Sequence, residues 1–173
     1  MKIAHDRFMG MALDLAREAL AAGEFPVGCI LVYDGNPIAG AGRTGTRRYT
    51  PSELDHAEMI ALRRMENLDF PVDRTRVTLY CTLEPCLMCF GALLISGIGS
   101  IVYAYEDAMG GGTQCDRSHL PPLYRDRNLQ VLPGIGRAES LALFKSFFSR
   151  PDCTYWRDSL LARYTLACPD TSE

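Results

Sequence analysis

Two short stretches of this chain have to meet in space, and this requirement constrains the fold more than any other feature. The first stretch carries His56 and Glu58, and the second is Pro85-Cys86-Leu87-Met88-Cys89. Imidazole and thiolate are good zinc ligands; a structural zinc site usually takes four protein ligands, whereas a catalytic site takes three and a water. One histidine and two cysteines at tight spacing, with no evident fourth ligand, therefore favour a catalytic zinc ion.

The spacing places both stretches at the start of helices. Cys86 and Cys89 are three residues apart, so they share one face of a helix, and the preceding proline suits a first turn. The positive end of the helix dipole lowers the pKa of a thiol there and favours the thiolate. Asp55 is a good N-cap residue, which puts His56 and Glu58 in the first turn of a second helix. We therefore expect two helix N-termini to meet at one metal, with Glu58 beside the water-filled position.

Each motif taken alone has a plainer interpretation. Asp55-x-x-Glu58 also fits a capping box that merely closes a helix end. The two cysteines could form a redox pair or lie in the core, and a single histidine is more often an ordinary surface or core residue. The combination is far more specific, because H-x-E followed by P-C-x-x-C is the signature of zinc-dependent nucleobase deaminases.

The wider sequence resembles the cytidine deaminase superfamily, and within it the tRNA-specific adenosine deaminases. FPVGCILV at 25–32 resembles the first strand of that family, and HAEMIALR at 56–63 resembles its first motif helix. LYCTLEPCLMC at 79–89 resembles the strand and turn that lead into the second motif helix. The resemblance extends from Phe8 to Asp107 and fades beyond that residue.

The resemblance implies hydrolytic deamination of an amino-substituted base, with one Zn²⁺ per chain held by His56, Cys86 and Cys89. Such an ion lowers the pKa of a bound water to roughly 7. Glu58 would then carry the proton of the water to the ring nitrogen and to the departing ammonia, as general acid–base catalysis requires.

Two departures from the family pattern bear on the substrate. The resemblance implies that Val27 and the backbone near Pro85 line the base pocket, but the asparagine with which the family contacts its substrate is absent. Thr44 is the nearest equivalent, and a hydroxyl cannot reproduce the paired donor and acceptor of an amide. The tail after residue 150 also lacks the basic C-terminal helix of the family. One candidate substrate is tRNA with adenosine at the wobble position, and the other is a free base or nucleoside of the guanine, adenine or cytosine type.

Two further classes of function compete with a deaminase. A zinc-bearing module without catalysis would use the fold only for binding or dimerisation, but the intact Glu58 and the three-ligand count argue against it. A thiol–disulfide enzyme would instead cycle Cys86 and Cys89 between thiol and disulfide. One zinc ion per chain, without such cycling, would exclude the redox class.

Length and composition limit the number of domains and the cellular compartment that we expect for the chain. A chain of 173 residues, 47% of them hydrophobic, suits one domain over 1–173, with a core at about 5–150 and a helical extension at about 151–173. Because the sequence shows no apolar signal segment, we expect a cytoplasmic protein with free thiols and no membrane span. The net charge of −3 indicates no general basic surface, and we interpret Arg43, Arg47 and Arg48 as part of a solvated loop.

The hydrophobic pattern predicts an α/β fold in which a mixed sheet lies between helices. The resemblance implies the three-layer α/β/α sandwich of the cytidine deaminases, with five strands and helices on both faces. The passage from 77 to 105 predicts a parallel βαβ unit, and 110–112 predicts a flexible glycine turn. We expect helices at 7–21, 56–66, 86–96, 138–149 and 155–166, and strands at 27–33, 38–41, 77–81, 101–105 and 129–132.

The helix expected at 86–96 is apolar on almost every side, and such a helix needs burial all round. One face of a sheet would cover only part of it. We therefore expect a homodimer with residues 87–95 in the interface, as the resemblance also implies.

Overall fold

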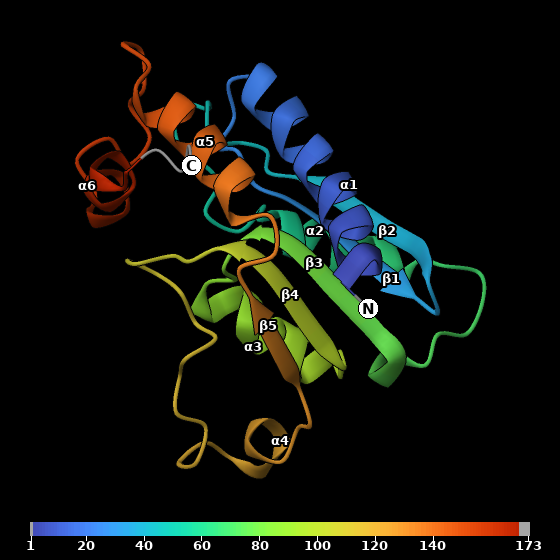
Figure 1. Ribbon diagram of the computed structural model, residues 1–173. Coiled ribbons are helices and arrows are strands. Elements are labelled where there is room, and N and C mark those ends of the chain that lie inside the picture. Colours follow the sequence, from blue (N-terminus) through green and yellow to red (C-terminus); the bar gives the residue numbers. More distant parts are fainter. Residues whose placement is uncertain (1, 170–173) are drawn as a thin grey trace.

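The computed structural model describes residues 2–169, and within them a mixed sheet has the strand order β2-β1-β3-β4-β5 (Figure 1). β1 pairs antiparallel with β2 and β3, whereas β3, β4 and β5 run parallel. The five-stranded mixed sheet and the parallel pair across the expected βαβ unit are confirmed. The strands are β1 (Gly28–Tyr33), β2 (Asn36–Gly42), β3 (Val77–Leu83), β4 (Ser100–Tyr105) and β5 (Gln130–Pro133).

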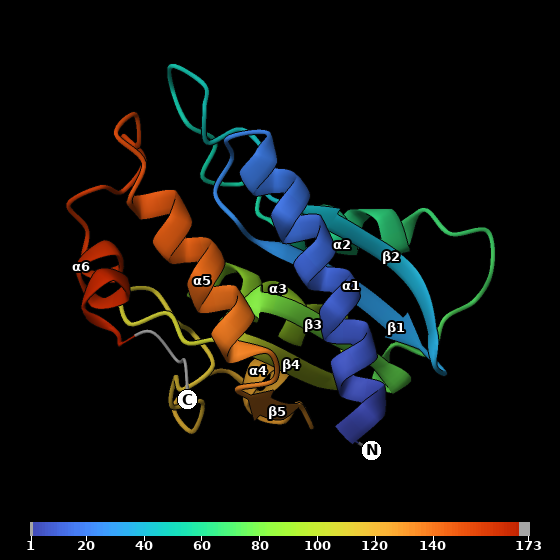
Figure 2. The same ribbon diagram turned by 45° about the horizontal axis from the view of Figure 1, so that its top comes forward.

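Helices cover both faces of the sheet. The long helices α1 (Lys2–Ala21) and α5 (Arg137–Phe148) lie side by side on one face, while α2 (Ala57–Glu66) and α3 (Leu87–Ser96) lie on the other (Figures 1 and 2). The C-terminal helix α6 (Leu160–Ala167) packs against α5, and its Thr165 hydroxyl is 3.0 Å from the hydroxyl of Tyr105 at the end of β4. The connections hold a 3₁₀ turn (Arg74–Arg76) and α4 (Pro122–Arg125). This is the three-layer α/β/α sandwich that the resemblance implies.

The two faces of β1 show why the sequence forms these layers. Successive side chains of a strand point to opposite faces, and almost every residue of β1 is buried. Ile30 and Val32 belong to the apolar cluster under α1, and Cys29 and Leu31 belong to the cluster under α2 and α3. A Cβ added to Gly28 would lie 2.2 Å from a carbonyl oxygen of α1, so glycine permits the helix to cross the strand closely.

The β1–β2 hairpin turns at Asp34 and Gly35, both of which have positive φ, at 49° and 77°. Positive φ at both central residues is the requirement of a type I′ turn, which Asp-Gly meets well. The adjacent β3–α3–β4 unit ends its helix at Gly97 in the left-handed conformation. The carboxyl ends of the parallel strands β3 and β4 therefore open onto one edge of the sheet, beside the start of α3.

Several element boundaries differ from those expected. Helix α1 begins at Lys2 rather than at residue 7, and α2 begins after His56, which takes the N-cap position that was expected for Asp55. The predicted helix at 155–166 is wrong over its first five residues, 155–159. Helix α6 begins at Leu160, because the Ser159 side chain accepts from the amide of the third residue beyond it and caps the helix there. The residues before it form an irregular segment.

Neither disulfides nor membrane-spanning helices contribute to the described part of the fold. The cysteines of the described region are free thiols, as expected for a chain that relies on packing rather than on disulfides. Within residues 2–169, no helix is both long enough and apolar enough to cross a bilayer.

Candidate active site

The predicted meeting of two helix N-termini is present. His56 is the N-cap residue of α2, Cys86 is the N-cap residue of α3, and Cys89 lies one turn further along α3. The Nδ1 atom of His56 lies 3.6 Å from the sulfur of Cys86 and 3.5 Å from that of Cys89. These atoms all lie within 4.8 Å of one another, so they could hold a single metal ion. Two sulfurs and one imidazole nitrogen match the ligand preference of zinc.

The electrostatics of the thiols favour a metal. A hydrogen bond from the thiol of Cys89 lowers the pKa of Cys86, which favours the thiolate form of this sulfur. Burial disfavours a charge on His56, but its hydrogen bond with Cys86 and the nearby Glu58 outweigh burial and raise its pKa. A thiol must lose its proton to ligate zinc, so metal binding would release the proton that Cys89 holds.

Glu58 lies in the first turn of α2, and its side chain is only 3% exposed. Burial raises the pKa of its carboxyl group, and a raised pKa suits a group that must hold and release a proton near neutral pH. The alternative capping box with Asp55 is not formed, because the amide of Asp55 donates instead to the hydroxyl of Ser52 at 3.2 Å. Glu58 is therefore directed toward the interior rather than toward the helix end.

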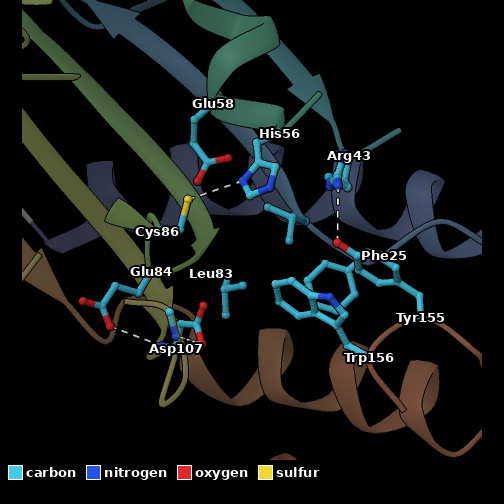
Figure 3. Close-up of a pocket in the computed structure, with 12 residues that line it drawn as sticks. Phe25, Arg43, His56, Glu58, Leu83, Glu84, Cys86, Asp107, Tyr155 and Trp156 are labelled. Atoms are coloured by element: carbon cyan, nitrogen blue, oxygen red, sulfur yellow. Dashed lines mark hydrogen bonds between the residues drawn. The ribbon is translucent and has the colours of Figure 1, made fainter. Parts of the chain in front are cut away.

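A pocket of about 450 Å³, part of it open to solvent, lies between these groups and the C-terminal part of the chain. Figure 3 shows His56, Glu58 and Cys86 on one side of this pocket, with the aromatic rings of Phe25 and Trp156 across from them. Apolar side chains make up much of the wall, and a few polar groups converge on the space, as is usual for small-molecule sites. Further lining residues are Val27, Leu83, Glu84, Asp107 and Tyr155.

Arg43 is buried at this pocket, with 3% of its surface exposed, which corrects its assignment to a solvated loop. Its Nη1 donates to the carbonyls of Thr44 at 2.6 Å and of Asp55 at 2.7 Å, and its Nη2 donates to the carbonyl of Ser52. The guanidinium therefore fastens the 44–55 loop that leads into His56. A guanidinium can satisfy several carbonyls at once because it carries five N–H donors.

The other two arginines of that cluster, Arg47 and Arg48, are exposed as expected. Thr44 is exposed as well and does not line the pocket, where Arg43 lies instead. Val27 does line the pocket, and its carbonyl accepts from the amide of Arg43 at 2.7 Å. Pro85 is buried behind the wall, where its carbonyl accepts from the amide of Gly112 at 2.9 Å.

Glu84 and Asp107 follow the carboxyl ends of β3 and β4, and the sequence reasoning missed both. Glu84 accepts hydrogen bonds from the amides of Asp107 and Thr113, each at 3.2 Å, and from the Thr113 hydroxyl. Asp107 accepts from two amides of the following turn, and burial raises its pKa. Their positions in the sequence could have identified them, because ligand sites in open α/β sheets gather at the carboxyl ends of parallel strands.

The glycine run at 110–112 is packed against this carboxylate pair and is not a free turn. Gly111 forms a β-bridge with Cys86, and a Cβ added to it would lie 2.4 Å from Oε2 of Glu84. A Cβ on Gly112 would lie 2.8 Å from the backbone of Leu87 at the start of α3. The glycines therefore allow this loop to lie against the metal-site helix, where any side chain would push it away.

Sequence reasoning did not place Tyr155 and Trp156 at the site, because an aromatic stripe such as that of Trp156 and Tyr164 is more often core or interface than a base-stacking platform. Tyr155 and Trp156 belong to the irregular segment between α5 and α6, far in sequence from the metal motifs. Trp156 has a φ of 53°, and a bulky residue in the left-handed region costs on the order of 1–3 kcal/mol. Such strain persists only where the surrounding contacts enforce it.

Zinc-dependent deaminases are the class of protein in which this donor set and a nearby buried glutamate occur together. The chain belongs to the family of the cytidine and deoxycytidylate deaminase zinc-binding region, whose pattern residues 2–105 match. It is accordingly a zinc-dependent hydrolase that acts on the C–N bond of a cyclic amidine.

Individual relatives carry narrower names. The chain is 36% identical over 147 residues to the tRNA-specific adenosine deaminase of Haemophilus influenzae, covering 84% of this chain and 83% of that protein. It is 33% identical over 153 residues to tRNA-specific adenosine deaminase 2 of Danio rerio, covering 83% and 70%. A solved structure from a study of A-to-I editing by tRNA:A34 deaminases at the wobble position is similar with a TM-score of 0.65 at 31% identity, covering 79% of this chain and 98% of that one.

Proposed function

We propose that this deaminase converts adenosine at the wobble position of tRNA to inosine, with release of ammonia. Two curated relatives bear the name tRNA-specific adenosine deaminase, and the similar solved structure comes from a study of A-to-I editing. The single observation that carries the chemistry is the buried carboxyl group of Glu58 in the same pocket as His56 and Cys86.

The proposed roles follow from the geometry. His56, Cys86 and Cys89 would hold the zinc ion, which when bound would lower the pKa of a water to roughly 7. Glu58 would carry one proton of the attacking water to the ring nitrogen next to the carbon that bears the amino group. It would then carry the second proton of that water to the amino group, so that the C–N bond breaks, ammonia leaves and the ring carbon keeps the water oxygen. General acid–base help of this kind contributes about 10²–10⁴-fold in rate.

The test compares point variants on one substrate. Glu58→Ala should keep its zinc and lose inosine formation on a tRNA with adenosine at the wobble position, whereas His56→Ala should lose both. Glu66→Gln, near the other end of the same helix and exposed, is the matched control and should retain activity. Full turnover by Glu58→Ala would exclude this residue as the proton carrier.

Contacts to the base by Val27, Thr44 and Pro85 remain proposals with different support. Val27 lines the pocket, so its side chain is available to the ring. Pro85 supports the wall through its carbonyl, and Thr44 would reach a substrate only outside the pocket. A Val27→Ala variant should therefore raise the KM more than a Thr44→Ala variant does.

A second candidate function is deamination of a free base or nucleoside. The aromatic wall of the pocket favours this second function. The C-terminal segment supplies this wall, whereas the family pattern has a basic helix in that part of the chain. Ammonia release across guanine, adenine, cytosine, their nucleosides and tRNA, with Glu58→Ala as the blank, separates the two candidates. Release from a free base alone would refute the tRNA assignment. Silence across the panel with zinc bound would favour either a substrate outside the panel or a non-catalytic zinc module.

We also propose a cytoplasmic homodimer of single-domain chains that meet through the 86–96 helix. The chain itself buries Phe90 and Leu93 of α3, so this helix is not bare on all sides, but Leu87 and Ile95 remain 63% and 52% exposed. Exposed apolar residues on one helix favour a partner surface. Sedimentation should show a dimer that Leu87→Glu dissociates; a monomer for the unaltered chain would refute the proposal.

A further inference from the structure

The C-terminal segment supplies an aromatic platform to the metal pocket. Tyr155 and Trp156 line the same cavity as His56, Glu58 and Cys86. Figure 3 places Trp156 beside Phe25, across the space from His56. A base that enters the pocket with its reactive edge toward the metal ligands would therefore have one face of its ring against this platform.

The rings of the platform are held in fixed relation. The rings of Tyr155 and Trp156 are stacked, with centroids 5.1 Å apart and planes 9° apart. Phe25 contacts both in T-shaped geometry, at centroid distances of 5.3 Å to Tyr155 and 5.8 Å to Trp156. Tyr155 is buried, whereas Trp156 keeps part of its surface exposed at the pocket. Stacking on one side thus leaves the indole available to a further ring.

Tyr155 ties this platform to the loop that carries the metal ligand. Its hydroxyl donates to Glu53 at 2.9 Å, and Nη2 of Arg43 donates to the same hydroxyl at 3.4 Å. Both partners belong to the chain segment that leads into His56. One hydrogen-bond cluster therefore positions both the platform and His56. The two parts are distant in sequence, since Tyr155 and Glu53 are 102 residues apart.

Two features of Trp156 bear on a role in binding. Its backbone is held at a φ of 53°, a strained conformation that clusters at functional sites. Among residues 2–169 its indole N–H has no hydrogen-bond partner, and this nitrogen is not one of the buried unpartnered atoms, so it is accessible to water or to a ligand. The strained backbone and the accessible indole edge both suit a side chain that is placed for a ligand.

We propose that Trp156 binds the substrate by stacking its indole on the base that is deaminated, and that Tyr155 positions it. This inference rests on the proposed deaminase function and extends it to a residue outside the metal motifs. Base–aromatic stacking tolerates any base because every base has a π-face. Its loss on substitution weakens binding by about 5- to 150-fold.

The chain offers a direct spectroscopic test, because Trp156 is its only tryptophan. Zinc-loaded Glu58→Ala protein is titrated with an anticodon stem–loop RNA that carries adenosine at the wobble position. Indole-selective fluorescence should be quenched as the RNA binds, with the same midpoint as the anisotropy of a labelled RNA. A stem–loop with an abasic wobble position should bind without this quenching. Binding of the adenosine RNA without any change in indole fluorescence would overturn the proposal.

Kinetics of variants provide an independent test. Trp156→Leu keeps the apolar bulk and should raise the KM for the active substrate about 5- to 150-fold, while Trp156→Phe should restore part of the loss. Tyr155→Phe, which removes the hydrogen bond to Glu53, should have a smaller effect in the same direction. Phe70→Leu, an exposed aromatic residue outside the pocket, is the matched control. Zinc content and the thermal midpoint are measured for each variant, so a folding defect is recognised.

Failure of this inference and failure of the proposed function give different results. Inosine formation by the wild type with an unchanged KM for Trp156→Leu overturns the stacking role and leaves the tRNA assignment intact. No deamination of RNA, but quenching by free adenine or guanine, overturns the tRNA assignment and supports stacking on a free base.

Discussion

The buried Arg43 provides the sharpest test of how the site is assembled. Its guanidinium donates to the carbonyls of Thr44, Ser52 and Asp55, and a hydrogen bond to a charged group contributes about 1.5–3 kcal/mol. Thr44 is exposed, so water can replace its bond, and the other two amount to about 3–6 kcal/mol. Burying the apolar side chain of Arg43→Met offsets about 1–2 kcal/mol. We therefore expect the free energy of unfolding to fall by about 2–4 kcal/mol.

Urea unfolding of the Arg43→Met protein measures this loss, and competition with a chelating dye measures the affinity for zinc. Zinc should bind more weakly, because the freed 44–55 loop no longer holds His56 in place. Arg48→Met is the matched control, since the Arg48 side chain is 64% exposed, and it should change stability by less than about 0.5 kcal/mol. A loss below about 1 kcal/mol for Arg43→Met, with unchanged zinc affinity, would refute the idea that this residue fastens the loop.

Two further predictions concern the edges of the site. Gly111→Ala places a Cβ 2.4 Å from Glu84 and should lower turnover on the active substrate. Gly10→Ala, whose Cβ would have no atom within 4 Å, is the control and should leave turnover unchanged. Equal turnover of the two variants would refute the tight packing at Gly111. Burial raises the pKa of Glu106, but hydrogen bonds from Arg137 and Tyr164 outweigh it and lower the pKa from 4.5 to about 2. This stabilisation is complete above pH 4.5 and is lost as the pH falls toward 2. Glu106 is one-third exposed, so we expect about 1 kcal/mol, and acid unfolding curves of Glu106→Gln should lack this part of the slope.

The parts of the molecule that sequence predicts are those with local signals. The β3–α3–β4 unit is recognisable because its apolar runs and the Gly97 stop are adjacent in the chain. The metal group is recognisable because Cys86 and Cys89 have a helical spacing and His56 belongs to a specific motif. The residues of the βαβ unit that interact are close in sequence, and the metal group is identified by the type and number of its ligands.

The parts that sequence did not predict depend on tertiary contacts. Nothing in the residues around Arg43 indicates that its guanidinium turns inward to three carbonyls, since the same GRTGTRR stretch fits a solvated loop equally well. An aromatic run near Trp156 fits a helix by periodicity, but Trp156 has a left-handed backbone and the helix begins only after the Ser159 cap. The substrate pocket is therefore less predictable than the metal group within it.

The distribution of the pocket along the chain has a consequence for biosynthesis. A ribosome makes the chain from its N-terminus, so His56, Cys86 and Cys89 leave the exit tunnel before Trp156 does. The nascent chain can thus acquire its zinc-binding group while the wall opposite is still missing. The metal group and the aromatic wall opposite it are therefore completed at different times during synthesis.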